Sequence, residues 1–387
     1  MSKTSNQGLL ILGIVLISIN LRTSIASVGP LIPFIREDLE ISNGLAGFLT
    51  TLSLLTFALF SLFAPRIGKK LGHGKAIFLG ISLLAVGVVI RVLGGIEVLY
   101  LGTALTGIGI VIANVLMIPF FKARIPEKIG LMTALLSTGM SLFAAIASGI
   151  SVPLAVDLGL GWRGSLASWV VLMILALLVW IPQLRAQSTG IQRNIFEGKN
   201  VWKSRLAWQV TLFMGAQSVM YFTMITWLPD MLIARGMSPV LAGVALSYMQ
   251  LISLIGTFFA PNLLIRLKEQ SPVILIVGVG YLLGFGALFW EQEWIVFAAL
   301  TIIGIGSGAS LSIAYTLISL RTADDQTTAK LSGMVQSAGY VLAALGPLVF
   351  GVSLDLFNNW NILIWFLLLM TIQFIAFGLP AGRDQKI

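Results

Sequence analysis

Long apolar runs recur along the whole chain, and they limit its fold more than any other feature of the sequence. About 20 residues of helix are needed to cross the ~30 Å hydrocarbon layer of a membrane, and runs of this length follow one another almost from end to end. The chain is 57% hydrophobic and only 10% charged, whereas about a quarter of the residues in a soluble domain carry charge. We therefore expect an integral membrane protein.

The runs are continuous and rich in Leu, Ile, Gly and Ala, which favours helices over the alternating pattern of a membrane β-barrel. The breaks between them predict an all-α membrane protein with about twelve transmembrane helices. The predicted spans are 8–35, 43–65, 75–95, 99–121, 129–156, 163–183, 206–233, 240–266, 272–291, 294–319, 329–355 and 360–380. Since the first run is far longer than the apolar core of a signal peptide, we expect it to be retained.

Positive charge lies on one side of this topology. All but five of the 24 Lys and Arg residues fall at the chain ends or in the loops after even-numbered spans, and the opposite loops are acidic. Positively charged loops stay in the cytoplasm, so both termini are predicted to lie on the cytoplasmic side of the inner membrane. The net charge of +9 follows from this topology and suits contact with anionic lipid headgroups, and no nucleic-acid partner is expected.

The second half of the sequence repeats the first at a nearly constant offset of 196 to 198 residues. The stretch "ISNGLAGFL" at 41–49 has its counterpart in "MSPVLAGVAL" at 237–246, and "GIG" at 107–109 recurs at 304–306. Because each half has six spans, both halves have the same orientation, which predicts a parallel repeat about an axis along the membrane normal.

The repeat divides the chain into two pseudo-symmetric six-helix halves. The predicted N-terminal half is 1–184 and the C-terminal half is 206–387, while the polar segment 185–205 is a cytoplasmic linker with a short interfacial helix around Phe196 to Trp202. Two such halves suit alternating access, in which they rock about a solute site near the middle of the membrane. A solute transporter is the leading interpretation.

Several segments then resemble a known family. The architecture is similar to that of the major facilitator superfamily, and "FAPRIGKKLGHGK" at 63–75 resembles its glycine-and-basic cytoplasmic signature, although Pro65 stands where the common signature has an aspartate. The segments "NLRTSIASVGPLIPFIR", "ITWLPDMLIARGMSPVLAG" and "KLSGMVQSAGYVLAALGPLVFG" resemble more specifically those of the cyanate and 2-nitroimidazole permease family. The resemblance implies the major facilitator fold and permease activity, with cyanate as one solute it suggests.

Arg22 is the most informative single residue. It lies about 14 residues from either end of its span, or ~21 Å by the helical rise, and a charge there costs at least ~2.5 to 3.5 kcal/mol. No Asp or Glu lies in the middle of another span, so we expect Arg22 to bind an anionic or strongly hydrogen-bond-accepting solute; a structural arginine bonded to backbone carbonyls is the alternative. Asn20, Thr23, Ser24 and Ser27 share the opposite face of the helix, and the pattern leaves open which face lines a cavity.

Further candidates are spread over both halves. Arg91 is a second cation for the solute or a side chain that reaches outward, since Glu97 follows only six residues later. The other predicted solute-binding residues are polar or aromatic groups within spans, for each of which interhelical hydrogen bonding is the alternative role. They are Asn114, Gln217, Tyr221, Tyr315, Gln336 and Tyr340.

Two features are predicted to serve conformational change. Gly68, Lys69, Lys70 and Gly72 are expected to form a tight basic turn that braces the second and third helices. Trp227, in "TWLP", is expected to be an interfacial aromatic or a gate.

Enzyme chemistry is not expected. The chain has no Cys, and His73, its one histidine, falls in a loop, so neither a zinc cluster nor a histidine triad can form; no cofactor or metal is predicted. The glycines of "GIGSG" at 304–308 are predicted to permit close helix packing rather than dinucleotide binding.

The sequence therefore predicts a secondary active transporter for a small anion or polar weak acid. An exporter of neutral or drug-like compounds such as nitroimidazoles is the alternative, and a non-transporting membrane receptor is the third interpretation. We expect a monomer whose partners are the solute and membrane lipids. Without a mid-span carboxylate, no dedicated Asp or Glu is expected to carry coupled protons.

Overall fold

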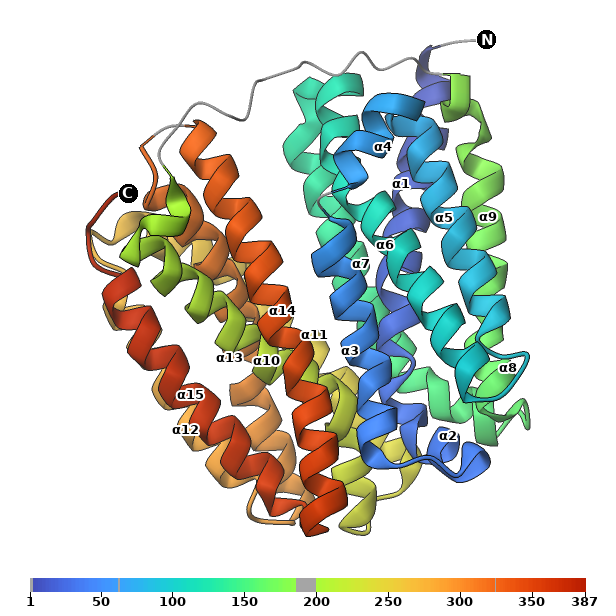
Figure 1. Ribbon diagram of the computed structural model, residues 1–387, viewed down its shortest axis with the longest axis vertical. Helices are drawn as coiled ribbons and strands as arrows, with labels where there is room; N and C mark the ends of the chain where they lie inside the picture. The colour runs from blue at the N-terminus through green and yellow to red at the C-terminus, as the bar shows by residue number, and fades with distance from the viewer. Residues whose placement is uncertain (1–2, 62, 186–199, 324) are drawn as a thin grey trace. The chain divides into compact units, whose positions relative to one another are not determined.

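The computed structural model describes residues 3–61, 63–185, 200–323 and 325–387, and these residues form helices and connecting turns without a strand (Figure 1). Ten stretches among them are long and apolar enough to cross a membrane. The 30-residue α10 (Arg205–Ala234) and the 17-residue apolar α12 (Ser271–Ala287) bring the set to 10 + 2 = 12. The all-α membrane fold with about twelve spans is thereby confirmed.

The first half of the chain follows the predicted spans, with two differences. The first membrane stretch runs from α1 (Lys3–Ala26) through the 3-10 turn η1 (Gly29–Leu31) and α2 (Ile32–Leu39), so it extends beyond residue 35. The predicted span 43–65 is divided, because α3 (Asn43–Phe60) ends and a separate α4 (Ala64–Leu71) begins with Pro65 in its first turn, where proline's missing N–H is tolerated. The remaining elements are α5 (His73–Ile90), α6 (Ile96–Arg124), η2 (Pro126–Lys128), α7 (Ile129–Val156), α8 (Gly161–Ser168), α9 (Val170–Trp180) and η3 (Ile181–Arg185).

The second half begins after the predicted linker, of which residues 186–199 lie outside the described part of the chain, as does most of the interfacial helix expected around Phe196 to Trp202. The elements after this segment are η4 (Val201–Lys203), α10, α11 (Pro239–Arg266), α12, α13 (Glu293–Leu320), α14 (Asp325–Phe357) and α15 (Asn361–Ala381). The mean hydropathy of α10 is lower than that of its neighbours because its buried faces carry polar side chains such as Gln217, Thr223 and Asp230.

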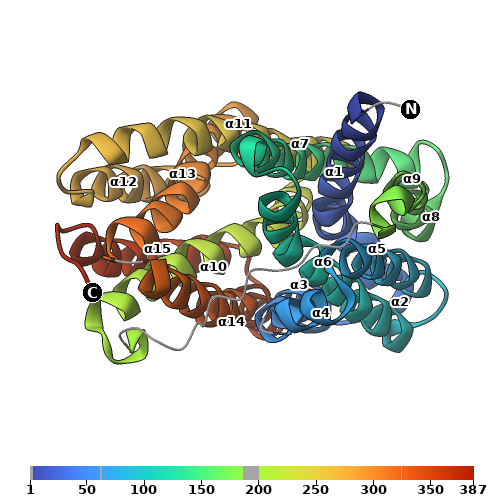
Figure 2. The same ribbon diagram turned by 90° about the horizontal axis from the view of Figure 1, so that it is seen from above.

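The helices group into two compact units. The N-terminal unit comprises Met1–Ile41 and Leu52–Gln192, and the C-terminal unit comprises Ser42–Thr51 and Arg193–Ile387. In the N-terminal unit, α1 packs against α7 and α9, and α5 pairs with α6. In the C-terminal unit, α10 packs against α14 and α15, and α13 packs against α11 and α12, as the two views show (Figures 1 and 2). The first half of α3, up to Thr51, therefore belongs with the C-terminal helices.

Glycines allow the closest helix contacts. A Cβ on Gly304 would lie 2.6 Å from the carbonyl oxygen of Met249, and a Cβ on Gly308 would lie 1.8 Å from that of Ser253, both on α11. On the other side of α13, a Cβ on Gly306 would lie 3.1 Å from the ring of Tyr281 on α12. Side chains cannot occupy such positions, so the prediction that "GIGSG" permits close helix packing is confirmed.

A buried core fills the N-terminal unit. Leu21, Leu84 and Met173 are fully buried in it, and Trp180 donates a hydrogen bond from its indole Nε1 to the carbonyl of Gly74 at 3.0 Å. This bond joins the end of α9 to the beginning of α5.

Candidate functional site

The face of α1 that carries Asn20 packs against the rest of the N-terminal unit. Asn20, Thr23, Ser24 and Ser27 are all buried, and the Asn20 side-chain amide donates to the carbonyl of Leu172 on α9 at 3.1 Å. A polar group in a membrane protein needs such partners because lipid offers none. Small polar residues therefore help to bind α1 into the N-terminal unit.

Arg22 lies on the other side of α1 and is only partly buried. It is 14 residues after Gly8, where the first membrane stretch begins, and 17 residues before Leu39, where it ends. The guanidinium thus starts from the middle third of the membrane stretch, on a side of α1 where Ser18 and Ala26 are buried as well.

Arg91 is the C-terminal cap of α5, and its side chain turns inward rather than reaching outward. It is 1% exposed, and its Nη1 donates to the carbonyl oxygen of Ser24 at 2.8 Å. Ser24 is in the last turn of α1, where carbonyls have no partner within the helix and a cation is favoured. The carbonyl of Ala26 in the same turn accepts a hydrogen bond from Ser148 on α7. Arg91 therefore helps to satisfy the end of α1, while its Nε and Nη2 make no hydrogen bond to the described residues.

Asn114, the third candidate of the N-terminal unit, is half-buried on α6. Arg22 and Arg91 are linked through α1, because Arg91 bonds the backbone two residues beyond Arg22. The cationic candidates thus gather on the second half of α1.

The C-terminal candidates lie mainly on α10 and α14, which pack side by side. Gln217 donates to the hydroxyl of the next residue at 2.8 Å, and Gln336 donates to a serine hydroxyl one turn earlier at 3.0 Å. Phe222 makes edge contacts with the rings of both Tyr221 and Tyr340, with centroids 5.3 and 6.3 Å apart. This aromatic row brings Tyr221 of α10 close to Tyr340 of α14.

Tyr315 lies on α13, where its side chain is 44% exposed. It is not among the residues that line the pocket described next.

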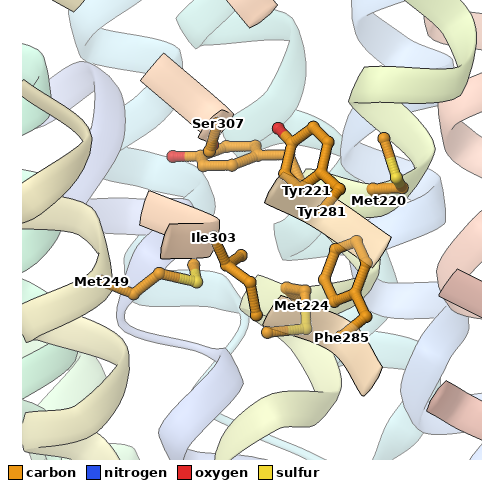
Figure 3. Close-up of a pocket in the computed structure, with 8 residues that line it drawn as sticks. All are labelled: Met220, Tyr221, Met224, Met249, Tyr281, Phe285, Ile303 and Ser307. Carbon is orange, nitrogen blue, oxygen red and sulfur yellow. The ribbon is translucent and has the colours of Figure 1, made fainter. Parts of the chain in front are cut away.

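A small pocket lies inside the C-terminal unit (Figure 3), and we call it the α10–α13 pocket. It is lined by side chains from four helices, which are Met220, Tyr221 and Met224 of α10, Met249 of α11, Tyr281 and Phe285 of α12, and Ile303 and Ser307 of α13. The space left between them is about 10 Å³, which is room for about one water molecule.

The pocket has a polar and an apolar end. The two tyrosine rings lie with Ser307 at one end, and Met249, Ile303, Met224 and Phe285 lie at the other (Figure 3). Tyr281 and Phe285 are one turn apart and their rings are parallel, with an interplanar angle of 3° and centroids 5.4 Å apart. The Tyr281 hydroxyl is also hydrogen-bonded to Ser310 at 2.9 Å, so this wall is fixed in place.

Of the predicted solute-binding residues, only Tyr221 lines this pocket. The other residues that line the pocket were not predicted, because the sequence does not show whether a methionine or phenylalanine of a membrane helix faces lipid, the protein core or a cavity. The one signal available was the aromatic pair at i and i+4 on α12, Tyr281 and Phe285.

Of the four residues expected to form a tight basic turn, Gly68, Lys69 and Lys70 lie within α4, and only Gly72 follows the helix. Lys69 and Lys70 are exposed in the last turn of α4, and Gly72 ends the helix with φ +81°, a value that favours glycine. Gly68 is buried, and a Cβ there would lie 2.7 Å from a methyl of Leu116 on α6. The turn therefore packs closely against the rest of the N-terminal unit.

Trp227 is buried completely, at 0% exposure. Its indole Nε1 donates to the carbonyl of Pro347 on α14 at 3.0 Å, and its ring makes an edge contact with Phe350. Gly47 of α3 lies beside both, since a Cβ there would be 2.4 Å from the Pro347 oxygen and 3.1 Å from the indole. Trp227 thus forms the centre of the contact between α10, α14 and the first turns of α3.

The same contact ends at Asp355, near the end of α14. Its carboxylate accepts hydrogen bonds from the backbone N–H groups of Asn43 and Gly44, at 2.8 and 2.7 Å, and from the Asn43 side-chain amide at 2.7 Å. The first N–H groups of a helix have no partner within it. Asp355 therefore caps the N-terminus of α3 from another helix.

Comparison with known proteins places this geometry in a family. A family model described as Major Facilitator Superfamily matches residues 11–347. The uncharacterized transporter YycB of Bacillus subtilis (strain 168) is 44% identical over 98% of this chain and 94% of its own length. The 2-nitroimidazole transporter of Escherichia coli (strain K12) is 35% identical, over 99% and 97% of the two chains.

Two further matches are more distant. The cyanate transport protein CynX of Escherichia coli (strain K12) is 26% identical, over 91% of each chain. Among solved structures, the xylose transporter XylE from E. coli matches with a TM-score of 0.78 at 14% identity, over 95% of this chain and 94% of that one. At that identity the structural match supports the fold alone.

Proposed function

The chain belongs to the Major Facilitator Superfamily and is a multi-pass membrane transporter, not an enzyme, and we propose that it moves a small anion or polar weak acid by alternating access. The loop charges favour an arrangement in the cytoplasmic membrane with both termini inside. The relatives are consistent with a small solute, since one is named for cyanate and another for 2-nitroimidazole.

The observation that carries the proposal is the position of Arg22. The opposite face of α1 is bound into the N-terminal unit through Asn20, which leaves the Arg22 side chain partly exposed near the middle of the first membrane stretch. A cation at that depth is costly unless it interacts with an opposite charge or strong acceptors. Arg22 already interacts within the protein, and an anionic solute adds a further charge-assisted contact, since a guanidinium fork binds planar anions in two-pronged geometry.

Arg91 supports this function as a positioning residue. The first membrane stretch is discontinuous, because the helix breaks between Ala26 and the 3-10 turn at Gly29, and broken helices are where transporters of this kind place solutes. By bonding the carbonyl of Ser24, Arg91 satisfies the backbone at the break. We propose that it holds the second half of α1, and hence Arg22, in a fixed position.

A second candidate function is transport of neutral planar compounds. The α10–α13 pocket favours it, because none of the eight side chains that line it is a carboxylate, lysine or arginine. The relative named as a 2-nitroimidazole transporter shares 35% of its residues with this chain over nearly its whole length. The direction of such transport, import or export, is tested by the same flux measurement.

The experiment compares solutes and arginine variants in liposomes. Purified protein is reconstituted and assayed for flux and affinity with cyanate and 2-nitroimidazole. A charge-assisted hydrogen bond is worth about 1.5 to 3 kcal/mol, so Arg22→Gln should weaken anion binding roughly ten- to hundredfold. Arg22→Lys should bind with intermediate affinity, since it keeps the charge and loses the fork.

The control is Arg266→Gln, at an exposed arginine in the last turn of α11, which should leave affinity unchanged. Thermal stability of the empty protein is recorded for every variant. If Arg22→Gln binds cyanate normally and melts much earlier than the wild type, Arg22 is structural and the anion proposal fails.

A further inference from the structure

We propose that the α10–α13 pocket is a subsite for the flat, uncharged ring of a small solute. The inference rests on the proposed transport function and names a part of the solute that Arg22 does not explain. It concerns the C-terminal unit alone, within which all four contributing helices pack together.

The lining chemistry favours a ring over an aliphatic chain. The thioethers of Met224 and Met249 lie at the apolar end of the pocket together with Phe285, and that of Met220 lies near the tyrosine rings (Figure 3). Sulfur is polarizable and makes favourable contacts with the edges of aromatic rings, and Phe285 can offer a further edge or offset contact. A saturated group of equal size would gain only from burial of its area.

The residues that line the pocket also favour an uncharged part of the solute. Besides the apolar residues, the pocket offers only the hydroxyls of Tyr221, Tyr281 and Ser307. An ion placed there would lose its hydration without gaining a counter-charge. A neutral substituent on the ring, such as a nitro group or a phenol, can instead meet the hydroxyl end while the ring lies at the apolar end (Figure 3).

One wall is rigid and the other is adaptable. Tyr281 is held by its parallel stack with Phe285, by its bond to Ser310 and by contact with Gly306. The methionines opposite have three rotatable bonds each and fill irregular gaps. Since the present space takes about one water molecule, a ring enters by rotation of Met224 and Met249 against the fixed aromatic wall.

The test uses probes that differ only in the ring. Affinities of benzoate and acetate, which share a carboxylate, and of the neutral ring compound 2-nitroimidazole are measured on the purified full-length protein. The wild type should bind benzoate at least about tenfold more tightly than acetate. Phe285→Leu should weaken benzoate and 2-nitroimidazole roughly three- to tenfold and leave acetate unchanged.

The matched control is Phe213→Leu. Phe213 is equally buried and its ring lies 4.6 Å from that of Phe374, but it does not line the pocket. Phe213→Leu should lower the melting temperature about as much as Phe285→Leu does, and it should leave the affinities for all three probes unchanged. If Phe285→Leu does not fold, Met224→Leu replaces it, with Met334→Leu as control; both methionines are buried and only the first lines the pocket.

The outcomes separate this inference from the function on which it rests. Equal affinity for benzoate and acetate, equal effects of Phe285→Leu and Phe213→Leu, or no binding of any ring probe would overturn the subsite. Ring binding that depends on Phe285, in a protein that moves no anion, upholds the subsite and rejects the anion proposal. Anion binding that depends on Arg22 without a preference for rings upholds the anion proposal and rejects the subsite.

Discussion

Removing the Asp355 carboxylate should loosen the start of α3. The first turn of that helix directs the N–H groups of Asn43 and Gly44 to this side chain. Replacing a capping side chain by alanine costs about 0.5 to 2 kcal/mol, and the loss of a negative charge near a helix N-terminus adds about 0.3 to 1 kcal/mol. Asp355 is exposed, so solvent screening keeps the charge contribution at the low end of that range.

The expected cost of Asp355→Ala is thus about 1.5 kcal/mol for local opening of the α3 N-terminus, or roughly tenfold faster amide exchange there. Asp355→Asn keeps one acceptor oxygen and loses the charge, so it should fall between the alanine variant and the wild type. The assay is hydrogen–deuterium exchange of the full-length protein in lipid nanodiscs, followed in peptides that cover 41–49.

The chain supplies its own control. Asp157 is the counterpart of Asp355 in the sequence repeat, 198 residues earlier, and it is also exposed, but no hydrogen bond from the described residues to its side chain occurs. Asp157→Ala should leave exchange at 41–49 unchanged. The reasoning is refuted if Asp355→Ala leaves these amides as protected as in the wild type, or if both variants accelerate their exchange equally.

Three further predictions use stability and flux. Trp227→Phe should lower the free energy of unfolding by about 2 kcal/mol, from one buried hydrogen bond and a cavity of about 40 Å³, whereas Trp365→Phe, at 64% exposure, should shift the melting temperature little; equal shifts would contradict this. Lys70→Glu should reduce transport more than binding, because it places negative charge at the negative end of α4. If cysteines introduced on the two membrane sides are as accessible in this variant as in the wild-type background, the bracing role is wrong. Asp157→Asn and Asp230→Asn should each leave pH-driven flux intact, and loss of that flux with retained binding in either variant would show a proton-carrying carboxylate.

Most helices could be predicted from the sequence because the membrane fixes their length and composition. The predicted span 129–156 coincides with α7. The first span was ended too early, at residue 35, because the charges of Arg36 to Asp38 resemble a loop. In the structure α2 continues to Leu39, and Asp38 binds Arg163 at 2.9 Å, so charged residues remain helical where they find a partner at the membrane edge.

The candidate site was harder to predict. Arg22 could be singled out, because a charge within an apolar run is conspicuous. The α10–α13 pocket could not, because residue type alone does not distinguish Phe285, which is fully buried, from Phe259, which is 72% exposed, and the spacing of Phe285 from Tyr281 is equally common in a helix that faces lipid. The Arg91 side chain turns inward because the carbonyl of Ser24 on α1 lies opposite it. The position of that carbonyl is set by helix packing and cannot be read from sequence spacing.

The polar contacts at the helix ends could not be predicted from the sequence repeat either. Both units join corresponding helix ends through an arginine, but the arginine and its acceptor stand at exchanged positions in the two units. In the N-terminal unit Arg163, at the start of the sixth span, bonds Asp38 and the carbonyl of Gly94. In the C-terminal unit the arginine is instead Arg235, at the end of the seventh span, and it bonds Asn361 at the start of the twelfth. Donor and acceptor can change places across such a contact without moving the helices.

The two sides of a close backbone contact cannot be exchanged in this way. This explains why corresponding positions of the two halves both carry glycine at such contacts. In the N-terminal unit a Cβ on Gly107 would meet Ser53 and Thr56 of α3, and in the C-terminal unit a Cβ on Gly304 would meet Met249 and Ile252 of α11. The partner positions are related by the repeat offset of 196 residues, yet their side chains have changed from small and polar to large and apolar. Of the three positions compared here, only the glycine, which must lack a side chain, is the same in both units. A shared glycine at a constant offset therefore indicates a shared helix contact, even where no other residue in that contact has been retained.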